Sequence, residues 1–215
     1  ETKTETPVAV SIPEVISLEP SSDPVTLEFP SLDSLLITAN LYDHGNEAPV
    51  IVLCHQARYN KFEYSEIAKT LFDNGFNCIA IDQRSGGPIV ESSNETALRA
   101  IEADKPVDYI DAEQDIVAAI NFAADKYNRK IILWGSSYSS TLALHLASEN
   151  EKIEAVIAFS PGDYLDEYKG DLKSKLVHLK TPMFVTSSKT EAPELTTLVG
   201  DLTNREFQTQ FIPTQ

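Results

Sequence analysis

Four serines fall within five positions of one stretch, a spacing that could serve nucleophilic chemistry. They are Ser136, Ser137, Ser139 and Ser140, in the run KIILWGSSYSSTLALHLA of residues 130–147. A serine hydroxyl becomes a nucleophile when a turn presents it to a substrate and a neighbouring base takes its proton. The apolar run before the serines predicts a strand, and the run after them predicts a helix. The alternative interpretation is a polar helix start without chemistry.

One of the four serines is better placed than the others for such a turn. In a strand–turn–helix nucleophile elbow, the positions two before and two after the nucleophile must be small, because the turn is tight. Ser137 has Gly135 before it and Ser139 after it, whereas Ser136 would put a tryptophan at the close-packed position. Ser139 and Ser140 would lie inside the helix, where hydroxyls bond the backbone. The pattern therefore predicts Ser137 as the nucleophile.

The segments around this turn predict an α/β fold. Residues 25–31 and 35–43 alternate in polarity, which is typical of an antiparallel hairpin. Short apolar runs then alternate with amphipathic runs, so that repeated strand–helix units predict a mostly parallel, doubly wound sheet. The expected strands are residues 49–55, 77–83, 130–135, 153–160, 182–188 and 206–213, and the expected helices are residues 62–75, 108–127, 137–150, 171–179 and 192–202.

Two of these segments carry finer expectations. The helix at 62–75 is expected to direct Ile67, Leu71 and Phe72 to one face. Residues 84–105 are polar and are expected to be irregular. No repeat or second domain is visible, so residues 25–215 are expected to form one domain.

With this order of elements, the sequence resembles the α/β-hydrolase superfamily, and most closely its dienelactone-hydrolase-like branch. Four stretches carry the resemblance. GSSYS stands at the family's G-x-S-x-G, with Ser139 where the family has glycine, and VIVLCHQARYN resembles the strand and His-Gly oxyanion turn. AIDQRSGG resembles an Asp-x-Arg-Gly-x-Gly stretch, and TPMFVTSSKTE resembles the strand that delivers the catalytic acid.

The resemblance implies a role for the two turns at the strand ends. Ser137 would attack an acyl carbonyl, and the backbone N–H groups of Tyr138 and Ala57 would form the oxyanion hole. His55 would shape the oxyanion turn and would not act as the base. The expected activity is a serine hydrolase that cleaves carboxylic esters or related acyl compounds through an acyl-enzyme.

The acid of such a site has more than one candidate. Glu191 follows the strand at 182–188 and is the first choice, with Glu194 as its rival. Asp163 follows the neighbouring strand and is the alternative, because the fold can accept the carboxylate there. A surface carboxylate without a role is the competing interpretation for each of them.

The general base is harder to place. In this fold the triad follows the order Ser, then Asp or Glu, then His. The sequence has four histidines, which are His44, His55, His145 and His178. All four precede the last expected strand, and the sequence reaches Gln215 just before the loop where the resemblance implies the histidine. We expect a truncation there, which would leave this piece impaired; the alternative is a non-catalytic binding protein on the same fold.

The composition of the chain argues against several classes of partner. Lys and Arg number 17 against 33 Asp and Glu, giving a net charge of −16, which argues against nucleic acid and anionic membrane surfaces. No apolar run approaches the roughly 20 residues of a membrane span. There is no His-x-His or His-Glu-x-x-His spacing, so we expect no metal and no organic cofactor. A small acyl or ester substrate remains the expected partner.

The N-terminal residues and the two cysteines give two further expectations. Residues 1–24 are rich in Thr, Ser, Pro and Glu, which is typical of a linker or extended arm. Such an arm often follows a removed export signal, so an extracytoplasmic location is expected. Cys54 and Cys78 fall in apolar runs and are expected to be buried free thiols.

Overall fold

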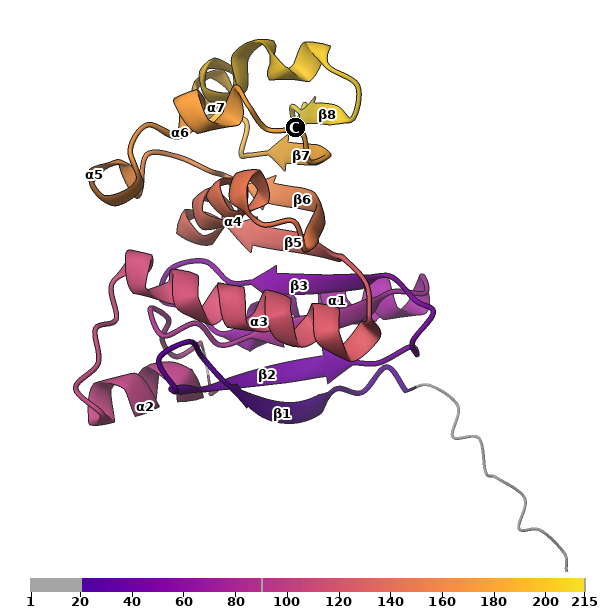
Figure 1. Ribbon diagram of the computed structural model, residues 1–215, viewed down its shortest axis with the longest axis vertical. Coiled ribbons are helices and arrows are strands. Elements are labelled where there is room, and N and C mark those ends of the chain that lie inside the picture. Colours follow the sequence, from indigo (N-terminus) through magenta and orange to yellow (C-terminus); the bar gives the residue numbers. More distant parts are fainter. Residues whose placement is uncertain (1–20, 90, 215) are drawn as a thin grey trace, which may run out of the picture.

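The computed structural model describes residues 21–89 and 91–214 (Figure 1). The predicted arm therefore lies outside the described residues, apart from its last four positions. Within the described ranges, eight strands form one sheet in the order β1-β2-β4-β3-β5-β6-β7-β8. The strands are β1 (Val25–Pro30), β2 (Leu36–Tyr42), β3 (Val50–Cys54), β4 (Asn77–Ile81), β5 (Ile131–Ser136), β6 (Ile153–Phe159), β7 (Met183–Thr186) and β8 (Gln208–Phe211).

The connections between the strands are mostly helical. The described helices are α1 (Ser65–Asp73), α2 (Glu95–Glu102), α3 (Ala112–Tyr127), α4 (Tyr138–Glu149), α5 (Asp166–Lys169), α6 (Leu172–Leu176) and α7 (Ala192–Val199). Short 3₁₀ turns cover Lys61–Tyr64, Tyr109–Asp111 and Gly200–Asn204. Among the helices of residues 21–89 and 91–214, none has both the length and the apolarity needed to cross a bilayer.

The pairing of the strands agrees with the predicted mixed sheet. β1 pairs with β2 and β2 with β4 in antiparallel fashion, and the remaining pairs are parallel. All five residues of β3 and all five of β4 are buried, as expected of continuous apolar strands covered on both faces. The carboxyl ends of β3 to β8 consequently meet at one edge, where α/β sheets bind ligands.

Helices cover the two faces of the sheet unequally. One face packs against α3, α4, α6 and α7 in a single large core. The other face packs against α1 over β3 and β4 in a smaller core that includes Cys78 and Phe72. Both cysteines are buried free thiols, as expected. In Figure 1, α3 and α4 lie in front of the sheet.

The face that α1 covers continues over β5 to β8 as a row of aromatic side chains. Trp134 on β5 stacks on Phe159 on β6, with the ring centroids 5.0 Å apart. Farther along, Phe184 and Phe211 are exposed, the latter by 54%. Within the described residues, this half of the face is therefore more open than the half under α1.

Two expectations about the helices are wrong. Ile67 is 39% exposed, whereas the other two residues of the expected face lie as predicted: Phe72 is buried beside Tyr64 and Ala68, and Leu71 packs partly buried against them. A 3₁₀ turn precedes α1, so the buried face follows the i, i+4, i+8 series from Tyr64.

The segment at 84–105 is also more ordered than expected, because it contains α2. Asn94 caps this helix, since its side-chain oxygen accepts the N–H of Ala97 at 2.8 Å. The helix buries the small residues Thr96, Ala97 and Ala100 against the sheet. Small alanines give a weak apolar pattern, which explains why the sequence predicted a loop.

Candidate active site at the carboxyl edge of the sheet

Ser137 occupies a sharp turn between β5 and α4. Its backbone has φ of 58° and ψ of −128°, a region that residues with a side chain rarely adopt. Backbone strain of this kind costs on the order of 1–3 kcal/mol and concentrates at functional sites. The turn is held by the N–H of Ser137, which donates to the carbonyl of Phe159 at 2.8 Å, and by that of Ser140, which donates to the carbonyl of Ser137 at 2.9 Å.

Gly135 shows why the turn needs a small residue two positions earlier. A Cβ added there would lie 2.5 Å from the backbone oxygen of Ser139 and 2.6 Å from the nitrogen of Ser140. Backbone atoms cannot move aside as a flexible side chain can. An elbow centred on Ser136 would place the side chain of Trp134 at this crowded position. The elbow therefore centres on Ser137 and not on Ser136.

The other three serines of the cluster use their hydroxyls structurally. Ser139 Oγ accepts the N–H of Ser136 at 2.9 Å, Ser140 Oγ donates to the carbonyl of Ser137 at 2.6 Å, and Ser136 Oγ lies 2.9 Å from the phenol oxygen of Tyr64. Ser137 is half-buried, and the described residues offer its Oγ no hydrogen-bond partner. Of the four hydroxyls, that of Ser137 is therefore the one without a partner among the described residues.

The turn after β3 lies beside the elbow, since β3 pairs with β5. The chain passes through His55, Gln56 and Ala57, and Arg58 adopts a positive φ of 65°. The N–H of Gln56 donates to Glu63 at 2.9 Å. Among the described residues, neither the N–H of Ala57 nor that of Tyr138 has an acceptor. Two free donors at neighbouring strand ends are what an oxyanion hole needs.

His55 is built into this turn and is not available as a base. Its Nδ1 donates to the carbonyl of Gln56 at 2.8 Å, and its Nε2 accepts the backbone N–H of Gln83 at 2.9 Å. Both ring nitrogens are thus engaged in one neutral tautomer. Burial lowers the pKa of the imidazole to about 4. This geometry supports the loop-shaping role and argues against proton transfer.

The two charged residues that flank Gln83 fix the strand end on which it lies. Asp82 accepts the N–H and the ammonium of Lys61 at 2.8 and 2.9 Å. The guanidinium of Arg84 is buried between Asp115 and Asp33, at 2.8 and 2.9 Å. Carboxylates from two other segments thus accept the hydrogen bonds of the Arg84 guanidinium.

Glu191 stands at the other side of the site, in the loop after β7. One of its oxygens accepts the hydroxyls of Ser160 and Ser188, at 2.8 and 2.9 Å, and the N–H of Ser188 at 3.2 Å. These hydrogen bonds, that of Ser160 first, lower the pKa of the exposed carboxyl. Glu191 is thus held in its charged form and reaches across to the end of β6.

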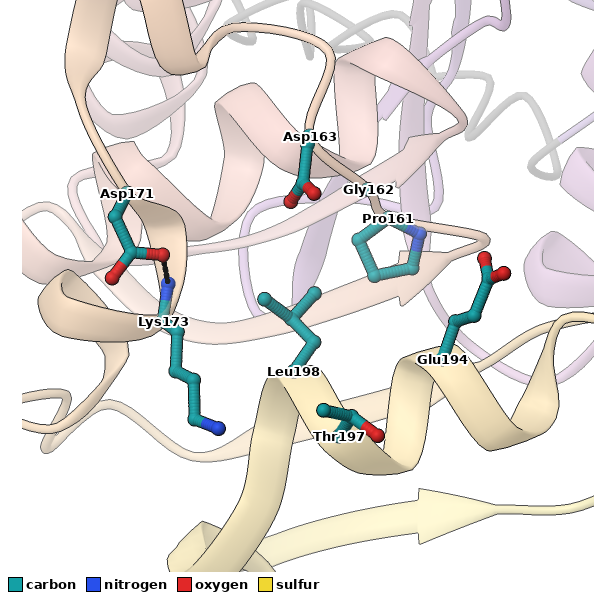
Figure 2. Close-up of a pocket in the computed structure, with 8 residues that line it drawn as sticks. All are labelled: Pro161, Gly162, Asp163, Asp171, Lys173, Glu194, Thr197 and Leu198. Carbon is teal, nitrogen blue, oxygen red and sulfur yellow. Dashed lines mark hydrogen bonds between the residues drawn. The ribbon is translucent and has the colours of Figure 1, made fainter.

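The rival carboxylates lie close to Glu191. Glu194 on α7 and Asp163 after β6 are both exposed and, with Glu191, line one hollow of about 280 Å³. Glu194 and Asp163 also border a larger hollow of about 380 Å³, which Lys173 lines from the start of α6 (Figure 2). Ser137 does not line either hollow. The structure therefore gathers the three candidate acids but does not select one by a bond to the elbow.

The remaining histidines lie away from Ser137. His145 is buried on α4, where neither ring nitrogen has a hydrogen-bond partner among the described residues, and burial lowers its pKa to about 4. The backbone N–H of His44 donates to Asn77 at the start of β4, and His178 is exposed before β7. Both of these lie near the amino ends of the parallel strands, opposite the elbow.

Gln83 was not singled out from the sequence, yet its side chain touches both turns of the site. Its Oε1 accepts the N–H of His55 at 2.8 Å, and its Nε2 donates to the phenol oxygen of Tyr138 at 2.7 Å. The only sequence signal is its place between Asp82 and Arg84. Nothing in local periodicity reveals contacts across 28 and 55 positions of the chain.

Comparisons with known proteins agree on the fold. The family model described as Dienelactone hydrolase family matches residues 37–191. The curated acyltransferase drtE of Aspergillus calidoustus is 28% identical over 137 residues, which is 63% of this chain but 42% of that protein. The chain thus spans less than half the length of this relative.

Solved structures give the same result at lower identity. An esterase from Pyrococcus furiosus is 16% identical with a TM-score of 0.71, and the match covers 98% of this chain and 87% of that one. An acylaminoacyl peptidase from Pyrococcus horikoshii is 17% identical with a TM-score of 0.61, over 89% of this chain and 36% of that one. At such identities the likeness shows a shared fold.

Proposed function

Because the chain belongs to the dienelactone hydrolase family, we propose that it is a serine hydrolase that cleaves carboxylic esters or related acyl compounds, with Ser137 as the nucleophile. The observation that carries the proposal is the turn itself. Ser137 has a strained positive φ at the end of a central strand, while the hydroxyls of its three serine neighbours are bonded internally. This arrangement is what the nucleophile elbow requires.

The proposed reaction has two steps. The Ser137 oxygen attacks the acyl carbon as the hydroxyl proton passes to a base. The electron pair of the C=O double bond moves onto the carbonyl oxygen, which becomes the oxyanion. The N–H groups of Ala57 and Tyr138 donate to that oxyanion. When the oxyanion collapses, the C–O bond to the alcohol breaks and the base returns the proton to the alcohol. Water then hydrolyses the acyl-enzyme by the same route.

The base and the acid complete the proposal. None of the four histidines lies beside Ser137, so the proposal takes the base from a histidine beyond residue 215, as the order Ser, acid, His requires. Glu191 is the proposed acid. Its lowered pKa keeps it charged, and a charged carboxylate stabilises the imidazolium that forms during the reaction.

A second candidate function has an observation in its favour. The described site contains no imidazole at the Ser137 hydroxyl, which suits a binding protein that retains the hydrolase fold without turnover. In that case the hollows beside Glu191 would bind a ligand and release it unchanged.

Labelling with a fluorophosphonate probe separates the two functions. We expect the natural full-length protein to react and the Ser137→Ala variant to give only background. Ser136→Ala is the matched control, since it removes the neighbouring hydroxyl that bonds Tyr64, and it should still label. If the natural protein labels no more than Ser137→Ala, the nucleophile is misassigned and the binding function is favoured.

The origin of the base is tested by comparing residues 1–215 alone with the natural protein, whose intact mass gives its actual end. We expect the 215-residue piece to turn over esters on the order of 10⁴-fold more slowly, because loss of one triad member has effects of that size. Equal turnover by the two proteins would show that the base lies within residues 1–215.

A further inference from the structure

Gln83 joins the two loops that carry the proposed oxyanion donors. It is fully buried at the end of β4, a strand that supplies neither loop. Its carboxamide oxygen binds the N–H of His55, at the start of the turn that leads to Ala57. Its carboxamide nitrogen binds the phenol of Tyr138, the residue directly after Ser137. A single side chain therefore spans from one donor loop to the other.

Both ends of this bridge are held by further contacts. On one side, the backbone N–H of Gln83 donates to the ring of His55 at 2.9 Å, so the same residue fixes the turn twice. On the other side, the phenol oxygen of Tyr138 lies 2.6 Å from Ser85 Oγ, and its ring stacks on Tyr109 with centroids 4.5 Å apart. Either oxygen can be the donor in the contact between Tyr138 and Ser85.

The burial of an amide in this position has an energetic consequence. An unbonded buried amide is destabilising, so Gln83 is tolerated because its polar atoms have hydrogen-bond partners. Its partners are not neighbours in its own strand or loop but the two turns of the site. Any separation of the turns would break one of these bonds.

We propose that Gln83 is a positioning residue that sets the separation between the N–H groups of Ala57 and Tyr138. The proposal rests on the proposed function, because those two groups are its oxyanion hole. Oxyanion donors are effective only when they lie about 2.7–3.1 Å from the developing oxyanion. Side chains that lock the supporting shell give this accuracy.

The test measures hydrolysis of 4-nitrophenyl acetate by the natural full-length protein and three variants, Gln83→Met, Tyr138→Phe and the double variant. Methionine has a similar shape and bonds neither turn, and Tyr138→Phe removes only the phenol oxygen. We expect each single variant to lower kcat by about 10- to 100-fold with KM changed less than about threefold, because the donors matter in the transition state. The double variant should have a kcat no lower than that of the more impaired single variant, because both substitutions break the same hydrogen bond between Gln83 and Tyr138.

Two matched variants separate positioning from a general loss of stability. Ser85→Ala removes the other partner of Tyr138 but keeps the bridge, so kcat should fall by less than about threefold. Gln83→Glu can still accept from His55 and from the Tyr138 hydroxyl, and it should restore part of kcat relative to Gln83→Met. Thermal unfolding of each variant shows whether it is folded at the assay temperature.

Three outcomes would overturn the inference. One is a kcat within twofold of the natural protein for Tyr138→Phe and Gln83→Met. Another is a loss for Ser85→Ala equal to that for Tyr138→Phe, which would show a purely structural network. The third is a natural protein in which the probe leaves Ser137 unlabelled, because then the proposed function itself fails. If Ser137 is labelled but the Gln83 variants keep their kcat, only the positioning role of Gln83 is rejected.

Discussion

The elbow end and the acid end of the site are held in different ways. At the elbow, Ser139 Oγ reaches the carbonyl of Cys54 at 2.8 Å, and Gln83 ties the end of β4 to both neighbouring turns. These residues are buried, and their partners lie far away in the sequence. The geometry of the turn at Ser137 is therefore fixed by the core of the fold.

At the acid end, the contacts are short in sequence and open to water. Glu191 bonds Ser188 three residues earlier, and Ser160 is its one bond to a neighbouring strand end. Glu194 and Asp163 compete with it from the same exposed hollow. The difference teaches that the strained turn at Ser137 is marked by its own backbone, whereas a candidate acid can be identified only by the partner that it orients.

Glu191→Gln should have the largest effect on this comparison. If Glu191 is the acid, loss of its charge lowers kcat by about 10⁴-fold, as for other triad carboxylates. The measurement is ester turnover by the natural full-length protein. Asp163→Asn and Glu194→Gln are the controls and should each lower kcat by less than tenfold. A damaging Asp163→Asn with a nearly silent Glu191→Gln would move the acid to the end of β6.

Two glycine substitutions test the difference in rigidity. Gly135→Ala at the elbow places a Cβ 2.5 Å from a backbone oxygen, and overpacking of this kind destabilises by about 3 kcal/mol. At the acid end, the Cβ of Gly162→Ala would meet the exposed ring of Tyr164 at 3.3 Å, which can move aside. Chemical denaturation should therefore show a loss below about 1 kcal/mol for Gly162→Ala. Equal losses would refute the contrast.

The two buried histidines predict how stability depends on pH. Both have a folded-state pKa of about 4, lowered by burial from 6.5. The unfolded chain therefore binds more protons between pH 6.5 and 4, so stability is fully present above pH 6.5 and falls as the pH drops towards 4. A shift of this size corresponds to up to about 3 kcal/mol per imidazole.

Variants at the two positions should respond in opposite ways. His145→Leu removes an imidazole that has no hydrogen-bond partner in the described part of the chain, so it should keep stability at pH 7 and flatten the decline towards pH 4. His55→Leu should lower stability already at pH 7, because the N–H of Gln83 and the carbonyl of Gln56 lose their partner. Unfolding measured at several pH values checks both. An unchanged slope in His145→Leu would show that this residue does not titrate as expected.

The smallest expected effect concerns single hydroxyls at the two ends. Ser140→Ala removes the bond to the carbonyl of Ser137 and should destabilise by about 1 kcal/mol. Ser188→Ala removes an exposed partner of Glu191 and should stay within about 0.5 kcal/mol. The two midpoints of urea unfolding give the comparison. A larger loss at Ser188 would mean that the acid end is more rigid than its contacts indicate.

The sequence predicted the parts of the site that follow local rules. The parallel sheet follows from apolar runs, and Ser137 follows from the size of its neighbours, which the contacts of Gly135 explain. The capped helix α2 was missed because its buried residues are small. Gln83 was missed because its role depends on contacts with residues 28 and 55 positions away, which no local pattern encodes.

The choice among the acids could not be made from the sequence for a different reason. Three carboxylates follow two adjacent strands, and loops have no periodicity to show which one points inward. Ile67 was wrongly placed on the buried face of α1, because a 3₁₀ turn shifts the phase of the series that begins at Tyr64. The choice of acid depends on the loops that leave β6 and β7, and the buried face of α1 depends on the turn that leads into this helix.

The position of Trp134 gives the protein an optical probe of its own. It is the only tryptophan in the sequence, and it lies directly before Gly135 in the elbow strand. Its indole stacks on Phe159 and meets the ring of Tyr64 edge-on at 6.3 Å, while the phenol of Tyr64 bonds Ser136. Emission from this indole therefore reports on the surroundings of Ser137, and it offers a way to follow the proposed acylation of this residue by fluorescence in unlabelled protein.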